Sequence, residues 1–479
     1  MSSYAHLLAE HAPFAIVQKI ADMLEIETYV VGGFVRDLFL QRTSKDIDIV
    51  CVGDSITLAE RFAKDTGSSK VVIFKRFGTA MVQYQGWTIE FVTARKESYQ
   101  CESRKPIVKA GTLEDDQKRR DFTFNALAIQ LNKANFGTLI DPFDGITDLE
   151  KKIIRTPLAS EETFSDDPLR MMRAIRFACQ LAFQLTPATH QAIANTAHRL
   201  EIVSMERIMT EFNKILTSSQ ARRGLFLLDQ TRLLDKILPE LQALKGREVI
   251  GKHSHKDNFL HTLEVLNNVT KVSDDLWLRW AALLHDIAKP RTKRFNPKIG
   301  FTFHGHEELG ARMIPRIFKR LRLPLQEAMR YVQKLVRLHL RPIILAQDIV
   351  TDSAVRRLIH DAGTDIDDLM KLCRADITSK NPHRVRLYFG NFERVEEKIA
   401  EVKASDFIRS LQPVIDGTFI MKTFDLTPSA QVGRLKKALK EAVIDGSVAN
   451  ERGALYQFLL KKAAEEGLTP QVTPEPDLL

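Results

Sequence analysis

Apolar and polar residues repeat with two different periods in the first 150 residues, which indicates a mixed domain of helices and strands. Residues 1–27 carry apolar side chains at helical spacing and predict a helix. TYVVGG at 28–33 predicts a short strand that ends in glycines, and FVRDLFLQRT after it predicts the start of a helix. DIDIVCVG at 46–53 alternates as a strand does, and residues 68–95 predict two or three further strands.

The remainder of the chain has mainly helical periodicity. Residues 161–244 read as helix, GKHSHKDNF at 251–259 is a polar break, and residues 258 to 390 are again helical and rich in histidine. Another boundary lies near 412–419, and the proline-rich end is expected to be disordered. We therefore expect an α+β multidomain protein with a mixed domain at 1–150, helical domains at 151–245, 246–390 and 391–465, and a tail at 466–479.

Composition and charge narrow the classes of protein. Hydrophobic residues make up 44% and charged residues 27%, and no apolar run approaches a bilayer span, so we expect no membrane contact. The N-terminus has no signal-peptide features, and four scattered cysteines predict a reducing, cytoplasmic location. The net charge of +9 favours an anionic partner such as nucleic acid. The basic clusters at 118–120, 316–322 and 434–437 agree with this, although each is also typical of a solvated helix face.

An Asp-x-Asp pair is the first candidate for chemistry. Residues i and i+2 of a strand share a face, so Asp46 and Asp48 project together while Ile47 and Ile49 face the core. Adjacent carboxylates repel, and a pair of Mg²⁺ ions relieves that repulsion. Glu90 is a third candidate carboxylate if its strand pairs beside the first. Many surface strands and the sugar-nucleotide transferases also contain an Asp-x-Asp pattern, so the pair alone leaves these alternatives open.

Two glycines before the pair favour a phosphate site. Gly32 and Gly33 lie between a predicted strand and a predicted helix, where backbone N–H groups and the helix N-terminus can contact a phosphate. Arg36 lies in the first helical turn and can reach the same anion. The alternative is an ordinary glycine turn with Arg36 paired to Asp37.

A second cluster, EDDQKRRDFTFNALAI at 114–129, places Arg119 and Arg120 beside Asp121. Arginine suits phosphate and ribose contacts because its guanidinium donates two parallel hydrogen bonds. Asn125 then precedes an apolar run that enters a buried element. A charged loop whose acids and bases pair with each other is the alternative.

A third cluster, SDDPLRMMRAIRF at 165–177, carries three arginines along one side of a predicted helix. Arg170, Arg173 and Arg176 recur at every third residue and repel one another unless an anion lies opposite. Asp167 also suits the N-cap of this helix, with Pro168 in the first turn, which is a purely structural role.

These three motifs, in this order, resemble the class II tRNA nucleotidyltransferase and bacterial poly(A) polymerase family over about the first 240 residues. The resemblance implies a polymerase-beta-like α/β nucleotidyltransferase head followed by an all-helical neck. It implies that Asp46 and Asp48 bind catalytic Mg²⁺ and that Asp167 and Arg170 read the base. It implies nucleotide contacts from Gly33, Arg36, Arg120, Arg173 and Arg176. The family usually has Glu-Asp where this chain has Asp166-Asp167.

Donor and acceptor chemistry supports the base-reading assignment. Cytosine and adenine each present an amino donor beside a ring-nitrogen acceptor, which matches a carboxylate and a guanidinium. Uracil and guanine present the reverse pattern and leave buried groups unpaired. No nucleic-acid template is then required, and the resemblance implies addition of CCA: the 3′ hydroxyl of tRNA attacks the α-phosphate of CTP or ATP, and pyrophosphate leaves.

Histidines and aspartates form a second constellation. His285 and Asp286 are adjacent after an apolar run, His261 lies on an earlier predicted helix, and Asp376 lies downstream. Imidazoles with carboxylates suit Mn²⁺, Ni²⁺, Fe²⁺ or Zn²⁺. The ordered set resembles the HD phosphohydrolase family over residues 258–380 and implies one metal bound by these four residues. His306 and His339 are candidates for a second site or for phosphate binding, ahead of His304.

Three alternatives to CCA addition stay open. The chain can be a bacterial poly(A) polymerase, an enzyme that adds only A or only CC, or mainly an HD phosphohydrolase; the HD domain can also be a relic that only shapes the tRNA-binding surface. Residues 93–116 predict a long loop before the second motif, which in this family is associated with addition of the terminal A. The HD substrate, the metal and the oligomeric state are not predicted.

Overall fold

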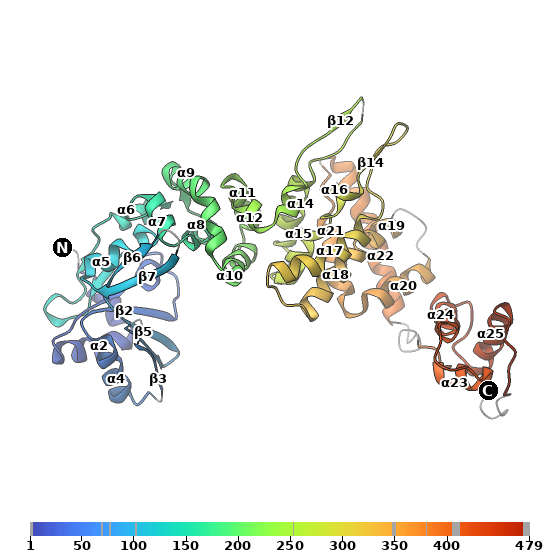
Figure 1. Ribbon diagram of the computed structural model, residues 1–479, viewed down its shortest axis with the longest axis horizontal. Helices are drawn as coiled ribbons and strands as arrows, with labels where there is room; N and C mark the ends of the chain where they lie inside the picture. The colour runs from blue at the N-terminus through green and yellow to red at the C-terminus, as the bar shows by residue number, and fades with distance from the viewer. Residues whose placement is uncertain are drawn as a thin grey trace. The chain divides into compact units, whose positions relative to one another are not determined.

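The computed structural model describes residues 3–68, 70–75, 78–100, 103–251, 253–346, 351–379, 381–404 and 412–472. The chain forms two compact units, Met1–Gln242 and Ala243–Leu479 (Figure 1). In the described part of the chain, no helix has the length and apolar character that crossing a bilayer requires. The architecture is the expected α+β one, with a sheet in the first unit and helices in the rest.

A seven-stranded mixed sheet organises the first unit. Its strand order is β3-β4-β5-β2-β1-β8-β9; β2 and β5 pair in parallel and the other neighbours are antiparallel. The bounds are β1 Glu27–Val31, β2 Asp46–Val52, β3 Val71–Phe74, β4 Thr79–Tyr84, β5 Trp87–Thr93, β8 Ala128–Gln130 and β9 Leu139–Ile140. The three strands β3, β4 and β5 confirm the prediction from alternation.

Four helices accompany this sheet: α1 Ala5–Ala9, α2 Ala12–Met23, α3 Gly33–Phe39 and α4 Ser55–Thr66. Phe14, Val17 and Phe62 on α2 and α4 are fully buried against it. The predicted single helix over 1–27 is two helices, because His11 has an extended conformation and Pro13 lies in the first turn of α2. Ile47 and Ile49 are buried, so β2 turns its aspartates away from this core, as predicted.

The predicted long loop at 93–116 is wrong in part. Residues 95–110 form an antiparallel hairpin of β6 Arg95–Gln100 and β7 Ser103–Ala110, followed by α5 Leu113–Lys118 with a Thr112 capping box. A segment of this length can satisfy its own backbone hydrogen bonds by folding back on itself. Cys101 and Glu102 lie outside the described residues.

The rest of the first unit is helical, as predicted, apart from one short parallel pair, β10 Ile153–Ile154 with β11 Gln184–Leu185. Its helices are α6 Gly145–Lys151, α7 Ser160–Asp166, α8 Leu169–Gln180, α9 Pro187–Thr196, α10 Met205–Leu216, α11 Ala221–Gln230, α12 Leu233–Ile237 and α13 Pro239–Gln242. Helix α8 packs against α10 and α11.

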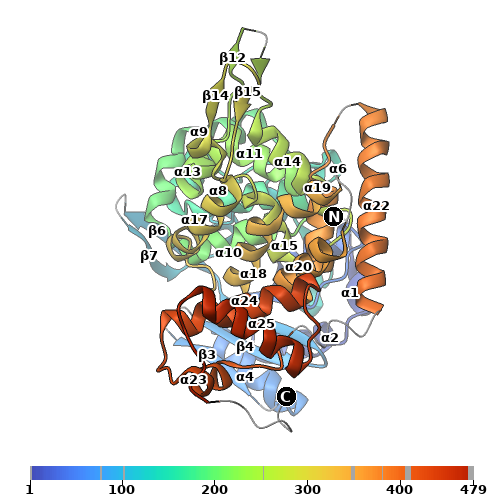
Figure 2. The same ribbon diagram turned by 90° about the vertical axis from the view of Figure 1, so that its right-hand side faces the viewer.

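The second unit begins with strands that the helical periodicity did not reveal. Two hairpins, β12 Val249–Ile250 with β13 His253–Ser254 and β14 Arg294–Asn296 with β15 Gly300–Thr302, lie beside each other (Figure 2). The helices are α14 Asn258–Val269, α15 Leu276–Leu284, α16 Lys289–Thr292, α17 His306–Arg320, α18 Glu327–Leu338, α19 Leu340–Leu345, α20 Asp352–Ala362, α21 Ile366–Ala375 and α22 Pro382–Ala404.

Three C-terminal helices share a core of their own. They are α23 Gly417–Phe424, α24 Ala430–Asp445 and α25 Arg452–Glu465, with Ile420, Leu439 and Leu459 fully buried. The start of α23 agrees with the predicted boundary near 412–419. Residues 466–472, expected to be disordered, are held because the N–H groups of Gln471 and Val472 donate to the Thr423 carbonyl at 2.8 and 3.2 Å. Residues 473–479 lie outside the described residues.

Candidate active site and metal centre

Three carboxylates meet on one face of the central sheet. Asp48 on β2 lies directly opposite Glu90 on β5 in the parallel register, which confirms that these two strands are neighbours. Burial raises the pKa of Asp48, which Arg120 opposes and Asp46 reinforces. Burial raises the pKa of Glu90 as well, and Asp48 adds to the effect. A divalent cation would relieve this accumulation of like charge, since hard cations prefer carboxylate oxygens.

The glycine turn between β1 and α3 lies against the same cluster. Gly32 has a φ of +74°, and a Cβ there would lie 2.9 Å from Arg120 Nη1 and 3.2 Å from Asp48 Oδ2. Only glycine therefore fits without displacing those two groups. Arg36, four residues along, pairs with Asp37 at 2.8 Å and donates to Asn125 Oδ1 at 3.0 Å. The predicted pairing of Arg36 with Asp37 is thus present, and the side chain also reaches the second motif.

A buried aspartate that the sequence did not single out organises the second motif. Asp116 is fully buried and forms ion pairs with both Arg119 and Arg120. Burial raises the pKa of Asp116, but the two guanidiniums outweigh this and leave it below the usual value. The acids and bases of this segment therefore pair with each other, as the alternative reading held, and the pairing orients Arg120 toward Gly32.

Each arginine of α8 has a partner within the protein. Arg173 Nε donates to Asp121 Oδ2 at 2.6 Å, and Arg176 Nε lies 3.1 Å from Glu211 Oε2. Arg170 is buried and donates to the carbonyls of Thr163 and Arg119 at 3.3 and 2.6 Å. The anionic groups expected opposite these arginines are therefore present within the chain: Asp121 and Glu211 lie opposite Arg173 and Arg176.

Phe177 gathers three of these cations. The guanidinium carbons of Arg36, Arg173 and Arg176 lie 5.1, 5.5 and 4.3 Å from the centre of its ring. The ring is nearly buried, and a cation over an aromatic face is stabilised by the ring quadrupole. Phe177 thus holds arginines from two motifs in one place.

Asp121 connects the second and third motifs. Its buried carboxylate accepts hydrogen bonds from Arg173 and from Asn125 Nδ2 at 2.9 Å. Burial raises the pKa of Asp121, but Arg173 and Asn125 outweigh this and lower it to about 2. The pKa of Arg173 rises in turn because of Asp121. This network fixes the neck helix α8 against the head.

Asp167 has a partly structural role. Its Oδ1 accepts from the Leu169 N–H at 3.2 Å at the start of α8, as the capping alternative predicted. Its Oδ2 lies 3.8 Å from Arg207 Nη2, and the side chain is 24% exposed. The carboxylate can therefore still contact a ligand, whereas the Arg170 guanidinium already donates to two carbonyls.

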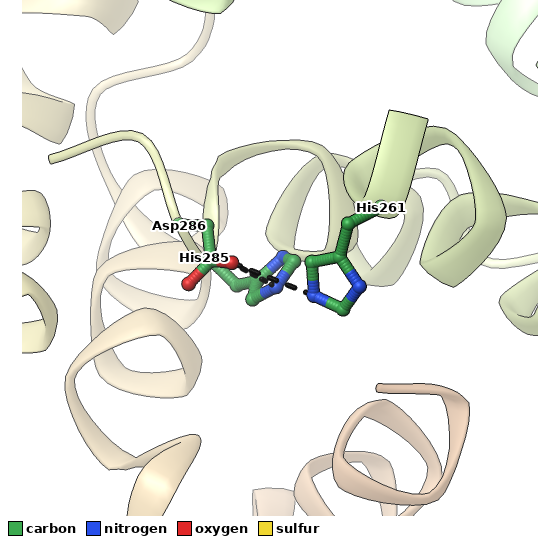
Figure 3. Close-up of side chains that lie close together, drawn as sticks. All are labelled: His261, His285 and Asp286. Atoms are coloured by element: carbon green, nitrogen blue, oxygen red, sulfur yellow. Dashed lines mark ion pairs between the residues drawn. The ribbon is translucent and has the colours of Figure 1, made fainter. Parts of the chain in front are cut away.

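The second unit assembles the histidines and aspartates around Asp286 (Figure 3). His261 Nε2 and His285 Nε2 lie 3.5 and 3.2 Å from Asp286 Oδ2. His306 Nε2 and His339 Nε2 lie 3.2 and 3.9 Å from the other oxygen, Oδ1. Two groups with metal-ligand geometry therefore share this one carboxylate, His261–His285–Asp286 and Asp286–His306–His339.

Asp376 belongs to this centre, whereas the exposed His304 does not. Asp376 Oδ1 lies 2.9 Å from His261 Nε2 and 3.8 Å from His285 Nε2, so it joins the first group. His304 is exposed and belongs to neither group. The structure thus brings together all six residues that the sequence singled out for this centre.

Hydrogen bonds at the opposite ring nitrogen orient the imidazoles. Nδ1 of His285, His306 and His339 lies 2.8, 2.8 and 2.6 Å from the carbonyls of Ala282, Phe303 and Val336. Since a carbonyl only accepts, Nδ1 carries the proton and Nε2 keeps its lone pair. Those three Nε2 atoms are buried and make no hydrogen bond within the described residues. This is the arrangement of metal-ligating histidines, whose other nitrogen donates to a carbonyl or carboxylate.

Burial and neighbouring charges shift the pKa values of this centre in different directions. Burial lowers the pKa of His339 to about 4, and the His285 imidazole contributes to the effect. Burial raises the pKa of Asp286, but His285 and Lys289 outweigh it and hold it well below the usual value. Burial lowers the pKa of His285, but Asp286 outweighs it and leaves it raised, so a metal at this imidazole would displace a proton.

Comparisons with known proteins agree with these two sites. Residues 28–155 match the poly A polymerase head domain, residues 182–245 the probable RNA and SrmB-binding site of polymerase A, and residues 258–381 the HD domain. The chain is 36% identical over 367 residues to the A-adding tRNA nucleotidyltransferase of Deinococcus radiodurans, covering 74% of this chain and 80% of the relative. It is 30% identical over 439 residues to the CCA-adding enzyme of Lactobacillus delbrueckii subsp. bulgaricus, covering 90% and 93%.

The chain belongs to the tRNA nucleotidyltransferase family. The resemblance inferred from the three motifs and the HD set is thereby confirmed. The crystal structure of the Bacillus stearothermophilus CCA-adding enzyme in complex with CTP has the same fold, with a TM-score of 0.64 and 24% identity over 95% of this chain and 98% of the other. The fold class, an α/β head with a helical neck and an HD domain, is therefore that of the family.

Several residues that organise these two sites were not predicted from the sequence. They include Asp116, Phe177 and Glu211. Each lies in a motif or a neighbouring helix, but its neighbours in the sequence do not mark it as part of a site. The available signal for Asp116 was its place among the acids beside the two arginines in EDDQKRRD, since two arginines need a nearby acid. Thr378 Oγ1, 2.9 Å from His261 Nδ1, had no sequence signal.

Proposed function

We propose that this enzyme adds CCA to the 3′ end of tRNA from CTP and ATP without a nucleic-acid template. The observation that carries the proposal is the carboxylate face of Asp46, Asp48 and Glu90 beside Gly32 and Arg120. Its relatives are named CCA-adding and A-adding enzymes. We also propose a cytoplasmic location and the domain bounds 1–150, 151–245, 246–390 and 391–465 expected from the sequence.

Asp46 and Asp48 would hold two Mg²⁺ ions, with Glu90 as a third carboxylate. Bound there, the ions would lower the pKa of the attacking hydroxyl and neutralise the triphosphate. Gly32 and Gly33 would present backbone N–H groups to the phosphates, and Arg120 lies against this turn. Arg36, Arg173 and Arg176 around Phe177 would supply further positive charge to the triphosphate and ribose.

Asp167 and Arg170 would discriminate the base. A carboxylate accepts from the amino group of C or A, and a guanidinium donates to the ring nitrogen. Both terminal nitrogens of Arg170 donate hydrogen bonds to backbone carbonyls in the structure. To contact the base, Arg170 would give up one of these two hydrogen bonds.

Incubation with tRNA that lacks its last three nucleotides tests this proposal, using each labelled NTP in turn. Incorporation of two C and one A, lost in Asp48→Ala with an unchanged circular dichroism spectrum, is the expected result. Incorporation of A alone, onto tRNA that ends in CC, would support A addition, which the Deinococcus relative's name favours. A long A tail would support a poly(A) polymerase, and full activity of a folded Asp48→Ala variant would refute the catalytic role.

A second activity is supported by the HD centre. We propose metal-dependent phosphohydrolysis, with His261, His285, Asp286 and Asp376 at one metal and Asp286, His306 and His339 at a second. The three buried, unbonded Nε2 atoms support this over a relic domain, because a decayed site has no reason to keep them. Mn²⁺, Ni²⁺, Fe²⁺ and Zn²⁺ suit these ligands.

Hydrolysis of 2′,3′-cyclic nucleotides to phosphomonoesters with added Mn²⁺ or Ni²⁺, followed by release of phosphate from the monoesters by a second water, tests the second activity. Release that disappears in Asp286→Ala, while nucleotide addition persists, is expected. Release that persists in that variant would show that the hydrolysis comes from elsewhere.

A further inference from the structure

The two hairpins of the second unit form one projecting element, which we call the hairpin arm. It comprises residues 245–251, 253–256 and 291–303, and the hairpins project from the helices α14 and α16 (Figures 1 and 2). His253 joins the hairpins: its ring lies 6.2 Å from that of Phe295, and its Nδ1 lies 2.9 Å from where a Cβ on Gly300 would sit. The ring of His255 contacts that of Phe301 at 4.9 Å. The hairpins therefore stand as a single structure.

The arm carries most of the excess positive charge of the chain. Its described residues include seven lysines and arginines but one acid, Glu248, so its net charge of +6 compares with +9 for all 479 residues. Glu248 is already paired with Lys293. Among the described residues, no carboxylate forms an ion pair with five further exposed cations of the arm: Arg247, Lys256, Arg291, Arg294 and Lys298. Such a concentration of unneutralised charge requires an anionic partner or solvent counterions.

Exposed apolar side chains lie among these cations. Val249, Ile250, Phe295 and Ile299 are 60, 39, 38 and 66% exposed. Isolated exposed apolar residues need no explanation, but these four lie on two short hairpins that contact each other. Aromatic and aliphatic side chains between lysines and arginines suit a strand whose bases stack while its phosphates are neutralised.

The base of the arm also borders the HD centre. Lys256 and Asp376 line one cavity of about 220 Å³ together with Thr378 and Tyr388. The second hairpin runs through His304 directly into His306. A polymer bound along the arm therefore lies next to the metal-ligand groups, which a partner bound only at the tips would not.

We propose that the hairpin arm binds RNA, with the phosphodiester backbone on its cations and unpaired bases on its exposed apolar side chains. The choice of RNA over an acidic protein or an anionic membrane rests on the proposed function, whose substrate is RNA, and on the aromatic rings among the cations. The arm belongs to the second compact unit, whereas the head carboxylates and the α8 arginines belong to the first.

Titration of fluorescent RNA tests the proposal without requiring any catalysis. The probes are tRNA lacking CCA and a single-stranded oligonucleotide of about 20 residues, each titrated at several salt concentrations. The arm variant combines Arg247→Gln, Lys256→Gln, Arg294→Gln and Lys298→Gln. The matched control removes four exposed lysines of the head, Lys64→Gln, Lys70→Gln, Lys133→Gln and Lys151→Gln.

The arm variant should bind the single strand at least about ten-fold more weakly, with a salt slope reduced by about 3, because each phosphate contact contributes about 0.7. Phe295→Ala should weaken binding by about ten-fold without changing the slope, because stacking carries no charge. The control should behave as the wild type. In nucleotide addition, the arm variant should raise KM for tRNA and leave kcat unchanged.

RNA affinity and salt slope equal to the wild type, in an arm variant with an unchanged melting temperature, would overturn the proposal. Unchanged RNA binding with lost binding to polyglutamate or to phosphatidylglycerol vesicles would assign the arm to another class of partner and overturn it as well. A chain that adds no nucleotides but shows the expected binding losses would refute the proposed function and keep the arm.

Discussion

A single methyl group at Gly32 tests the arrangement of the nucleotide site. In Gly32→Ala the new Cβ would lie 2.9 Å from Arg120 Nη1 and 3.2 Å from Asp48 Oδ2. Because the Arg120 guanidinium is the flexible end of a side chain, it would move, and with it the charge that opposes the raised pKa of Asp48. The change therefore displaces a proposed phosphate contact and a proposed metal ligand without removing either.

Two effects of different size follow. An alanine at a φ of +74° costs about 1–2 kcal/mol of folding stability, because its Cβ approaches the following carbonyl. A displacement of about 1 Å at reacting groups lowers the rate by about 100-fold. We expect a melting temperature lower by a few degrees and a kcat/KM for CTP lower by about 100-fold.

Gly67→Ala is the matched control. Its φ of +66° imposes a similar backbone strain, but no heavy atom lies within 4 Å of its Cβ position. Both variants are compared in thermal unfolding and in steady-state addition of labelled CMP to tRNA lacking CCA. If Gly32→Ala loses no more activity than Gly67→Ala, the contact with Arg120 and Asp48 does not matter and the assignment of this pocket is wrong.

Three further predictions concern the buried carboxylates Asp116, Asp121 and Asp286. Asp116→Asn leaves two arginines without their buried partner and should lower the free energy of unfolding by about 3–5 kcal/mol in urea titrations; a loss below about 1 kcal/mol would contradict this. The folded pKa of Asp121 is about 2, below its usual value, so its contribution is present above about pH 4 and is lost as pH falls toward 2. Asp121→Asn should remove about 2 kcal/mol of that pH-dependent stability, and an unchanged acid unfolding curve would contradict the assignment. Mn²⁺ at about 100 times its Kd should stabilise the second unit by about 2.7 kcal/mol in thermal unfolding, and Asp286→Ala should abolish the effect; equal stabilisation of the variant would place the ion elsewhere.

Local signals in the sequence were sufficient for much of the head. Alternation placed Asp46 and Asp48 on one face of a strand, and the glycine pair located the turn beside them, because both properties depend on neighbours only a few residues away. The helical periodicity of 161–244 was likewise confirmed. The hairpin at 95–110 was missed because its two strands pair with each other and not with the central sheet.

Partners distant in the sequence were beyond such signals. The arginines of α8 were expected to lie opposite an anionic group, but the sequence did not identify that group: Asp121 and Glu211 lie 52 and 35 residues away from Arg173 and Arg176 and are brought close only by packing. The shared role of Asp286 in both histidine groups also depends on the meeting of several helices. In both cases the sequence motif identifies the candidate site residues but does not identify the groups that form ion pairs with them.

By itself the sequence determined the residue types, their periodicity and the order of the motifs, and these were enough to identify the family and to select both sets of candidate ligands. Only the tertiary structure decided that Glu90 lies opposite Asp48, that Asp116 orients Arg120, and that the histidines turn unbonded Nε2 atoms toward Asp286. The physical reason is that charge and hydrogen bonding act over a few ångströms of space. Distance along the chain does not report that separation once strands and helices have packed.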